Sequence, residues 1–291
     1  MFRKMFPLSL ALAVCLSISG TAKADAVNLG AAGNFSVLAF TDLTLNTFTV
    51  NGNVGIGGGG HTLQKGTITG NLVIDPNATA TADLSKLNND FFVTGSINNP
   101  SSLATAISNA ISASQFAAGL ASTSLANIEN GNITSLTGGG VYQLAHIDLN
   151  GQSETLTLHG NASDVFIFNI TDYLQVSQSS ILLDGVSAAN VLFNITATNA
   201  SKESTIQKSD SVVFGTVLIP YESIVLLDAG VNGVGTGGVY GHLIGNDITI
   251  HSGGLVDTPT AAPEPASMLL FGTGLTALGA FARRRHRRKV S

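Results

Sequence analysis

The sequence predicts a mainly β protein built as a solenoid of short strands, with one long helix in addition. Three observations lead to this prediction. Short apolar stretches alternate with Gly- and Asn-rich turns along most of the chain. Three apolar segments resemble one another at a spacing typical of solenoid coils. One long segment rich in Ala, Leu and Ile has the spacing of a helix instead.

Residues 1–24 predict a signal peptide. A basic start and an apolar run at 6–18 precede Ala22-Lys23-Ala24, the small-x-small pattern that signal peptidase reads, so cleavage is expected after Ala24. Cys15 is the only cysteine and lies in the apolar run. The mature chain therefore has no thiol, which excludes disulfides, thiolate catalysis and cysteine metal sites.

Strand signals begin at Val27 and continue to Ile74. Period-two apolar stretches such as Phe35–Phe40 and Gly66–Ile74 are separated by Gly and Asn turns. The run Gly57–Gly60 predicts a flexible loop rather than a phosphate site, because no Lys-Ser/Thr pair follows it.

Residues 101–128 predict a long helix that interrupts the strands. Pro100 and the two serines after it form a start signal, and Asn130-Gly131 forms a stop signal. The segment 83–93 has a similar helical texture. One apolar face is expected on the long helix, made of Leu103, Ile107, Ala110, Ile111, Phe116, Leu120 and Leu125.

The repeating segments follow this helix. The stretches 164–170, 190–195 and 212–219 look alike, and their starts are 26 and 22 residues apart. This spacing fits one coil of a solenoid, in which each coil buries its apolar side against its neighbours. A second recurring pattern, an apolar stretch followed by Asp-x-Gly at 181–185 and 224–230, supports a repeat. A β-sandwich would also give short strands and turns and stays open as an alternative.

The C-terminal end predicts a sorting and anchoring tail. A linker at 259–265 contains Pro263-Glu264-Pro265, the 17 residues 266–282 are mostly apolar, and the basic segment 283–291 begins with Arg283-Arg284-Arg285. We expect a short transmembrane segment with its basic end in the cytoplasm.

These three elements in this order closely resemble the PEP-CTERM sorting signal of Gram-negative bacteria, which is also named after an ice-binding protein C-terminus. The resemblance implies cleavage near the Pro-Glu-Pro motif by an exosortase-type protease. It also implies export across the inner membrane, a transient membrane anchor, and a final place at the cell surface or outside the cell, often with exopolysaccharide.

The charge of the mature domain narrows its partners. Without residues 1–24 and 263–291 it keeps 4 Lys and 17 Asp or Glu, and 4 minus 17 gives a net charge of −13. Such a domain cannot neutralise phosphates, which excludes nucleic acid as a partner.

The mature domain, residues 25–258, resembles the ice-binding-like β-solenoid domains and the neighbouring choice-of-anchor-A surface domains. The resemblance is carried by Leu29–Leu38, Gly139–Tyr142, Val165–Phe168 and Gly215–Pro220. It implies a right-handed parallel β-helix with one long helix lying along it, which the helical segment at 101–128 would supply.

No catalytic or metal constellation is visible, and no cofactor is expected. His146 and Asp148 share a predicted strand face, but no further ligand lies at metal-binding spacing. Paired carboxylates for glycoside hydrolysis would have to come from acids that sit in predicted turns, where Asp is favoured for local hydrogen bonds. These acids are Asp164, Asp184, Asp228 and Asp247.

The tail and the missing catalytic cluster predict an exported, non-enzymatic protein of the cell surface or extracellular matrix, adhesive or associated with exopolysaccharide. The first alternative is an ice-binding protein, with Thr44, Thr47 and Thr49 as the expected ligand face and Thr155 and Thr157 as another possible part of it. The second alternative is a polysaccharide-acting β-helix enzyme, which requires converging carboxylates in an open groove.

Overall fold

A computed structural model describes residues 27–76, 91–98, 103–129, 131–207, 210–227 and 238–258. All of them belong to one compact unit, Ala24–Pro259. The predicted signal peptide, the linker at 259–265, the apolar segment and the basic tail lie outside the described residues. Within the described ranges, no helix has the length and apolar character needed to cross a membrane.

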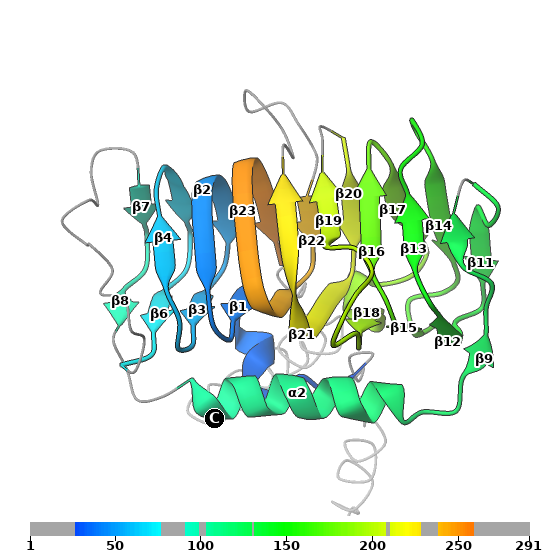
Figure 1. Cartoon of the computed structure of the whole chain (residues 1–291), viewed down its shortest axis with the longest axis horizontal. Coiled ribbons are helices and arrows are strands. Elements are labelled where there is room, and N and C mark those ends of the chain that lie inside the picture. Colours follow the sequence, from blue (N-terminus) through cyan, green and yellow to red (C-terminus); the bar gives the residue numbers. More distant parts are fainter. Residues whose placement is uncertain are drawn as a thin grey trace, which may run out of the picture. The chain divides into compact units, whose positions relative to one another are not determined.

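The described strands stack into a parallel solenoid with three long faces (Figure 1). All pairs of named strands are parallel, which rules out the β-sandwich alternative. We call the three faces A, B and C, in the order in which each coil passes through them. Two long strands turn from one face to the next without a break, β21 (Thr216–Leu227) from A to B and β2 (Leu43–Asn51) from B to C. One strand, β23 (Leu243–Asp257), passes through all three.

The strands of each face follow one another from one end of the solenoid to the other. Face A consists of β9 (Thr123–Ser124), β12 (Gly140–Leu144), β15 (Phe166–Ile170), β18 (Val191–Ile195), β21, β23, β1 (Val37–Ala39), β3 (Val54–Ile56), β6 (Leu72–Ile74) and β8 (Ile97–Asn98). Face B consists of β10 (Ile128–Glu129), β13 (Ile147–Leu149), β16 (Leu174–Ser177), β19 (Ser204–Gln207), β21, β23, β2 and β4 (His61–Leu63). Face C consists of β11 (Ser135–Thr137), β14 (Thr155–His159), β17 (Ser180–Asp184), β20 (Val212–Phe214), β22 (Gly238–Tyr240), β23, β2, β5 (Gly66–Ile68) and β7 (Phe91–Val93).

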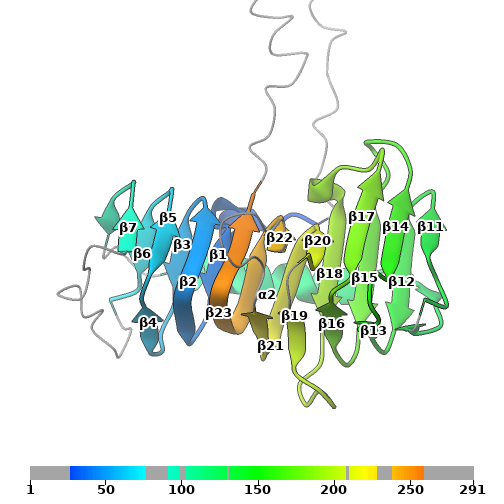
Figure 2. The ribbon, with the colours of Figure 1, turned by 90° about the horizontal axis from the view of Figure 1, so that it is seen from above.

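The order of the coils in space differs from their order in the sequence. The chain enters near the middle of the solenoid, and its first coils run toward the β8 end (Figure 2). Helix α2 (Ala104–Ala118) then runs back along the solenoid, and the later coils return from the β9 end to the middle. There the last coil pairs with the first, since Val37 lies opposite Leu243.

Helix α2 is shorter than the predicted helix at 101–128. It ends at Ala118, with Gly119 as its cap, and β9 and the start of β10 occupy positions predicted to be helical. The segment predicted as helical at 83–93 contributes β7 at Phe91–Val93, while 83–90 lie outside the described residues.

The buried face of α2 is also narrower than predicted. A stripe of small residues faces the solenoid, while Phe116, predicted to be in the core, is 61% exposed. Small side chains allow the helix axis to come close to face A, whereas a phenyl ring at the contact would hold it away. The buried stripe is Ala106, Ala110, Ala113 and Ala117.

The similarity between 164–170 and 190–195 has a structural cause. Asn169 and Asn194 are neighbours in register on face A, and both are buried beneath α2. Asn194 donates to Asn169 Oδ1 at 2.8 Å and to the Ser114 carbonyl at 3.0 Å, and Asn169 donates to the Ala117 carbonyl at 2.8 Å. The repeated Asn therefore ties the solenoid to the helix.

The third predicted repeat, 212–219, combines two elements. Val212–Phe214 is β20 on face C, whereas Thr216 begins the strand that stacks on β18. The second recurring pattern, at 181–185 and 224–230, is also coincidental, because β17 lies on face C and Ile224 lies on face B. The prediction of a solenoid was right, but its coil boundaries were wrong in this region.

Glycine and asparagine shape the corner between faces C and A. A Cβ on Gly70 would lie 2.4 Å from the Gly52 carbonyl carbon, and one on Gly95 would lie 2.5 Å from the Gly70 oxygen. The side chain of Asn53 accepts from the backbone N–H of Asn71 at 2.8 Å. Backbones of successive coils thus meet at this corner too closely for any larger residue.

Candidate functional site

Face B is the face that carries an ordered row of small outward side chains. Along each strand, fully buried residues such as Leu43 and Ile248 alternate with outward ones such as Thr44 and Thr249. Strand pairing places one outward residue of each coil in line with the next. This central row reads Glu129, Asp148, Gln175, Thr205, Val225, Thr249, Thr44 and Thr62.

The central row has two chemically different halves. Five successive coils, from β19 to β4, contribute only Thr or Val, and we call this part the threonine row: Thr205, Val225, Thr249, Thr44 and Thr62. Neighbouring members are separated by the spacing between strands, about 4.8 Å. Their methyl and hydroxyl groups are stiffly held because β-branched side chains have few rotamers.

The three threonines predicted as a ligand face do not lie on one face. Thr44 belongs to the threonine row on face B, while Thr49 pairs with Leu255 and Thr67 on face C. Between them Thr47 has a φ of 57°, at the irregularity in register between Asn46 and Phe48. This left-handed residue turns the chain from one face to the next, so period-two spacing does not continue across it. The other predicted pair, Thr155 and Thr157, lies in β14 on face C.

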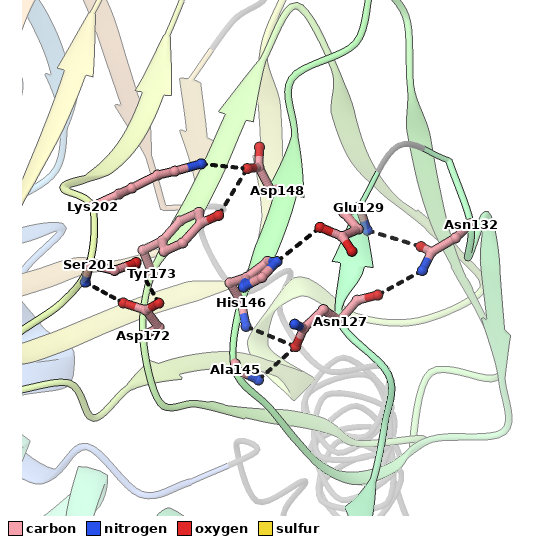
Figure 3. A network of polar contacts seen from close by, with 10 residues as sticks. All are labelled: Asn127, Glu129, Asn132, Ala145, His146, Asp148, Asp172, Tyr173, Ser201 and Lys202. Atoms are coloured by element: carbon pink, nitrogen blue, oxygen red, sulfur yellow. Dashed lines mark hydrogen bonds and ion pairs between the residues drawn. The ribbon is translucent and has the colours of Figure 1, made fainter.

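The other half of the central row contains charged residues, which are joined by hydrogen bonds and ion pairs (Figure 3). Tyr173 donates to Asp148 Oδ2 at 2.9 Å, and Lys202 Nζ lies 3.1 Å from the same oxygen. The ammonium group of Lys202 also lies 4.7 Å from the centre of the Tyr173 ring. The Tyr173 ring stacks on the His146 ring, with 4.8 Å between the ring centres. His146 bonds Glu129 at 3.2 Å.

This network is built for support rather than for chemistry. Contacts with Tyr173 and Asp148 raise the pKa of Lys202, and burial raises the pKa of the Tyr173 hydroxyl. Both groups therefore keep their protons at neutral pH. Asp148 is only 7% exposed, so no substrate reaches its carboxylate, although its Oδ1 has no hydrogen-bond partner.

The carboxylates predicted as enzyme candidates are dispersed. Asp164 accepts from the backbone and side chain of Asn161 in a turn, and Asp184 pairs with His159 at 2.8 Å. Asp247 lies at the corner between faces A and B, where it accepts from the backbone N–H of Asp42. The fourth candidate, Asp228, lies outside the described residues. Among the described residues, no three His, Cys, Asp or Glu side chains are grouped so that they could hold a metal ion.

Among the described strands, the other two faces show no comparable row. Face A is covered by α2 and the N-terminal segment, whose apolar residues pack with Leu192 and Ile244. Face C carries bulky outward residues, including Leu182, which is 37% exposed, and the rings of Phe214 and Tyr240, which stack at 4.8 Å.

Comparisons with known proteins agree with this architecture. Residues 26–252 match the family model described as Ice-binding-like, and residues 261–288 match the PEP-CTERM protein-sorting motif. Among curated proteins, none matches the chain.

Several solved ice-binding proteins have a similar fold. The antifreeze protein LeIBP from an Arctic yeast is 17% identical, with a TM-score of 0.54 over 83% of this chain and 98% of its own. The ice-binding protein of the Antarctic ascomycete Antarctomyces psychrotrophicus is 23% identical, with a TM-score of 0.56 over 81% and 99%. A domain of ice-binding protein 1 from Shewanella frigidimarina is 19% identical, with a TM-score of 0.53 over 80% and 98%.

These findings correct the functional prediction. Adhesion to exopolysaccharide was inferred from the sorting tail, which is an address and carries no information about the ligand of the domain. The domain itself matches the Ice-binding-like model over most of its length, which favours the ice-binding alternative over an adhesive matrix protein. The chain, which carries a PEP-CTERM sorting motif at its C-terminal end, belongs to the Ice-binding-like family.

Proposed function

We propose that the exported domain binds ice through the threonine row on face B. The observation that carries this proposal is the register of Thr205, Val225, Thr249, Thr44 and Thr62 across five successive coils. Membership in the Ice-binding-like family supports it independently.

The physical argument is one of repetition and rigidity. Ice is a repetitive lattice, and a parallel solenoid offers side chains at a repeat fixed by backbone hydrogen bonds. The side chains are β-branched, and the backbone of every member except Thr62 in the edge strand β4 is paired on both sides, so little conformational entropy is lost when the face orders water or meets a crystal. Each position offers a methyl group, and Thr249, Thr44 and Thr62 also offer a hydroxyl that water can bond, whereas the Thr205 hydroxyl is buried and has no hydrogen-bond partner.

The charged half of face B bounds this site. Glu129 and Lys202 are hydrated side chains that project from the surface, with side chains 48% and 53% exposed. Charged groups hold their own hydration shells, which do not match an ice lattice. We therefore assign the contact to the coils from β19 to β4 and leave the coils from β10 to β16 outside it.

We also infer how the protein reaches its place of action. The signal at 1–24 is removed after Ala24. An exosortase-type protease then acts on the tail near Pro263-Glu264-Pro265. The basic residues Arg283-Arg284-Arg285 stay in the cytoplasm and stop further transfer of the chain across the membrane. The domain is then released or held at the cell surface. The coils wind right-handed, as the resemblance to ice-binding-like solenoids implies. The sorting-motif match at 261–288 supports export and processing.

Two threonines of one strand provide a matched test. Thr44 and Thr49 both lie in β2 and are both half-buried, but Thr44 belongs to the threonine row and Thr49 to face C. Thermal hysteresis and ice recrystallisation inhibition are measured for residues 25–262 and for Thr44→Tyr and Thr49→Tyr. We expect Thr44→Tyr to lose most of the activity and Thr49→Tyr to keep it. An inactive parent protein, or an unaffected Thr44→Tyr, would contradict the proposal.

A further inference from the structure

The last coil of the chain is inserted into the middle of the solenoid. β23 pairs with β21 on one side and with β1 and β2 on the other. Val37 and Leu243, which face each other in this pairing, are 206 residues apart in the sequence. On its other side β23 pairs with β21 at the ordinary separation of one coil, 26 residues between Val217 and Leu243, so only the pairing with β1 and β2 closes a long connection.

This coil connects two separate blocks. The strands from β1 to β8 form one block at residues 37–98, and the strands from β9 to β22 form another at residues 123–240. Among the described strands, no pairing joins the blocks directly, and each pairs instead with β23. Helix α2 is a second bridge, because its small residues belong to one buried apolar cluster with Leu38 of one block and Leu218 of the other.

The threonine row runs across the same junction. Thr44 and Thr62 belong to the N-terminal block, and Thr205 and Val225 belong to the other. Thr249 of β23 lies between them and pairs with Val225 and Thr44. Without β23 the row would be two unconnected pairs.

We propose that pairing of β23 with β1 and β2 of the N-terminal block is the last step of folding and the step that completes the ice-binding row. The second part rests on the function proposed above. Closing a connection of about 200 residues costs more chain entropy than closing one coil, so each block gains its internal pairs first. β23 also leaves the ribosome and crosses the membrane after all other strands, directly before the sorting motif at 261–288.

A set of polar contacts holds the inserted coil at both ends. Before it, His242 Nδ1 lies 2.6 Å from the Phe35 carbonyl oxygen. After it, the Thr258 hydroxyl lies 2.7 Å from the Ser36 hydroxyl and 3.1 Å from the Asn51 carbonyl oxygen. These contacts all join the C-terminal coil to the first coil, as a closing step requires.

Refolding followed by pulsed hydrogen–deuterium exchange tests the order. The protein is residues 25–262, which contain the whole compact unit, and mass spectrometry of peptides reports protection without any need for ice. We expect β15 and β18 to be protected before the amides that join β23 to β1 and β2. Simultaneous or earlier protection of the amides that join β23 to β1 and β2 would overturn the proposal, whether or not the protein binds ice.

Two buried isoleucines give matched variants. Ile250 in β23 and Ile181 in β17 are both fully buried. Ile250→Ala should delay protection of β23 alone, whereas Ile181→Ala should delay both the β14–β20 coils and β23. An equal delay of β15 and β18 in both variants would refute late docking.

A second measurement covers the case in which these variants fold poorly. In the native state, Thr258→Val removes the hydroxyl contacts to Ser36 and Asn51 and should raise exchange of β23 amides about fivefold per hydrogen bond lost. Amides of β15 should be unaffected. Unchanged exchange in β23 would show that these contacts do not close the coil.

Discussion

Asn194 makes three buried hydrogen bonds, two of them to Ser114 of α2, and its removal has a predictable cost. The side chain is fully buried, donates to the Ser114 carbonyl and to Asn169, and accepts from the Ser114 hydroxyl at 2.6 Å. Asn194→Ala leaves these buried partners unsatisfied at about 1 kcal/mol or more each, and adds a small cavity. We expect unfolding free energy to fall by about 4 kcal/mol and the melting temperature by about 10 °C.

Urea unfolding followed by circular dichroism measures this loss. Asn150→Ala is the control, because Asn150 is exposed and its replacement should change stability by less than about 0.5 kcal/mol. The slope of the free energy with urea should stay the same in both variants, since the surface exposed on unfolding is unchanged. A loss below about 1 kcal/mol for Asn194→Ala would refute the reasoning, because the buried bonds would then contribute no more than exposed ones.

Three further predictions concern the site, the charged network and the corner. Val225→Thr completes the hydroxyls of the threonine row, so thermal hysteresis should rise modestly, and a fall would contradict the assignment of the row. Burial raises the pKa of Tyr173 above its unfolded value, so the stability that this residue contributes below pH 10 should be lost as pH rises through the folded pKa. Tyr173→Phe should weaken this alkaline loss of stability in thermal melts. An unchanged loss would contradict the role assigned to the Tyr173 hydroxyl. Gly70→Ala should lower the free energy of unfolding in urea by about 3 kcal/mol. Gly58→Ala should lower it little, because the nearest atom to a Cβ on Gly58 is 3.8 Å away. Equal losses of stability in the two variants would contradict the argument for close backbones at the corner.

Local patterns predicted the elements of the fold better than their arrangement. Alternating apolar residues and Gly-Asn turns identified strands because burial on one side imposes a period of two. The end of α2 at Ala118 was missed because alanine and leucine continue beyond it, and strand pairing at β9 and β10 overrides helix propensity there. Pairing of β23 with β1 left no local signal, since it depends on contacts across most of the chain.

The candidate site was predicted only in part for a related reason. Thr44 was identified, but its neighbours Thr249 and Thr205 come from distant coils and become a row only through strand register. Thr49 was grouped with it because nothing in the sequence marks Thr47 as a left-handed residue, a conformation that glycine or asparagine would have signalled. The contact of Lys202 with Asp148 had no sequence signal either, because 54 residues separate them.

The length of α2 limits where further coils can be added to this solenoid. Its 15 residues extend over about 22 Å, which equals the height of about five coils. Five successive coils contribute fully buried outward apolar residues to the cluster that contains the buried face of α2, while Val141 and Val73 of the flanking coils are only partly buried. These five residues are Ile167, Leu192, Leu218, Ile244 and Leu38. A coil inserted among these five would need about three more helical residues to keep the two lengths equal, whereas a coil added beyond either end of the helix would need none. Duplication of coils should therefore be tolerated at the ends of the solenoid and resisted in the part that the helix spans.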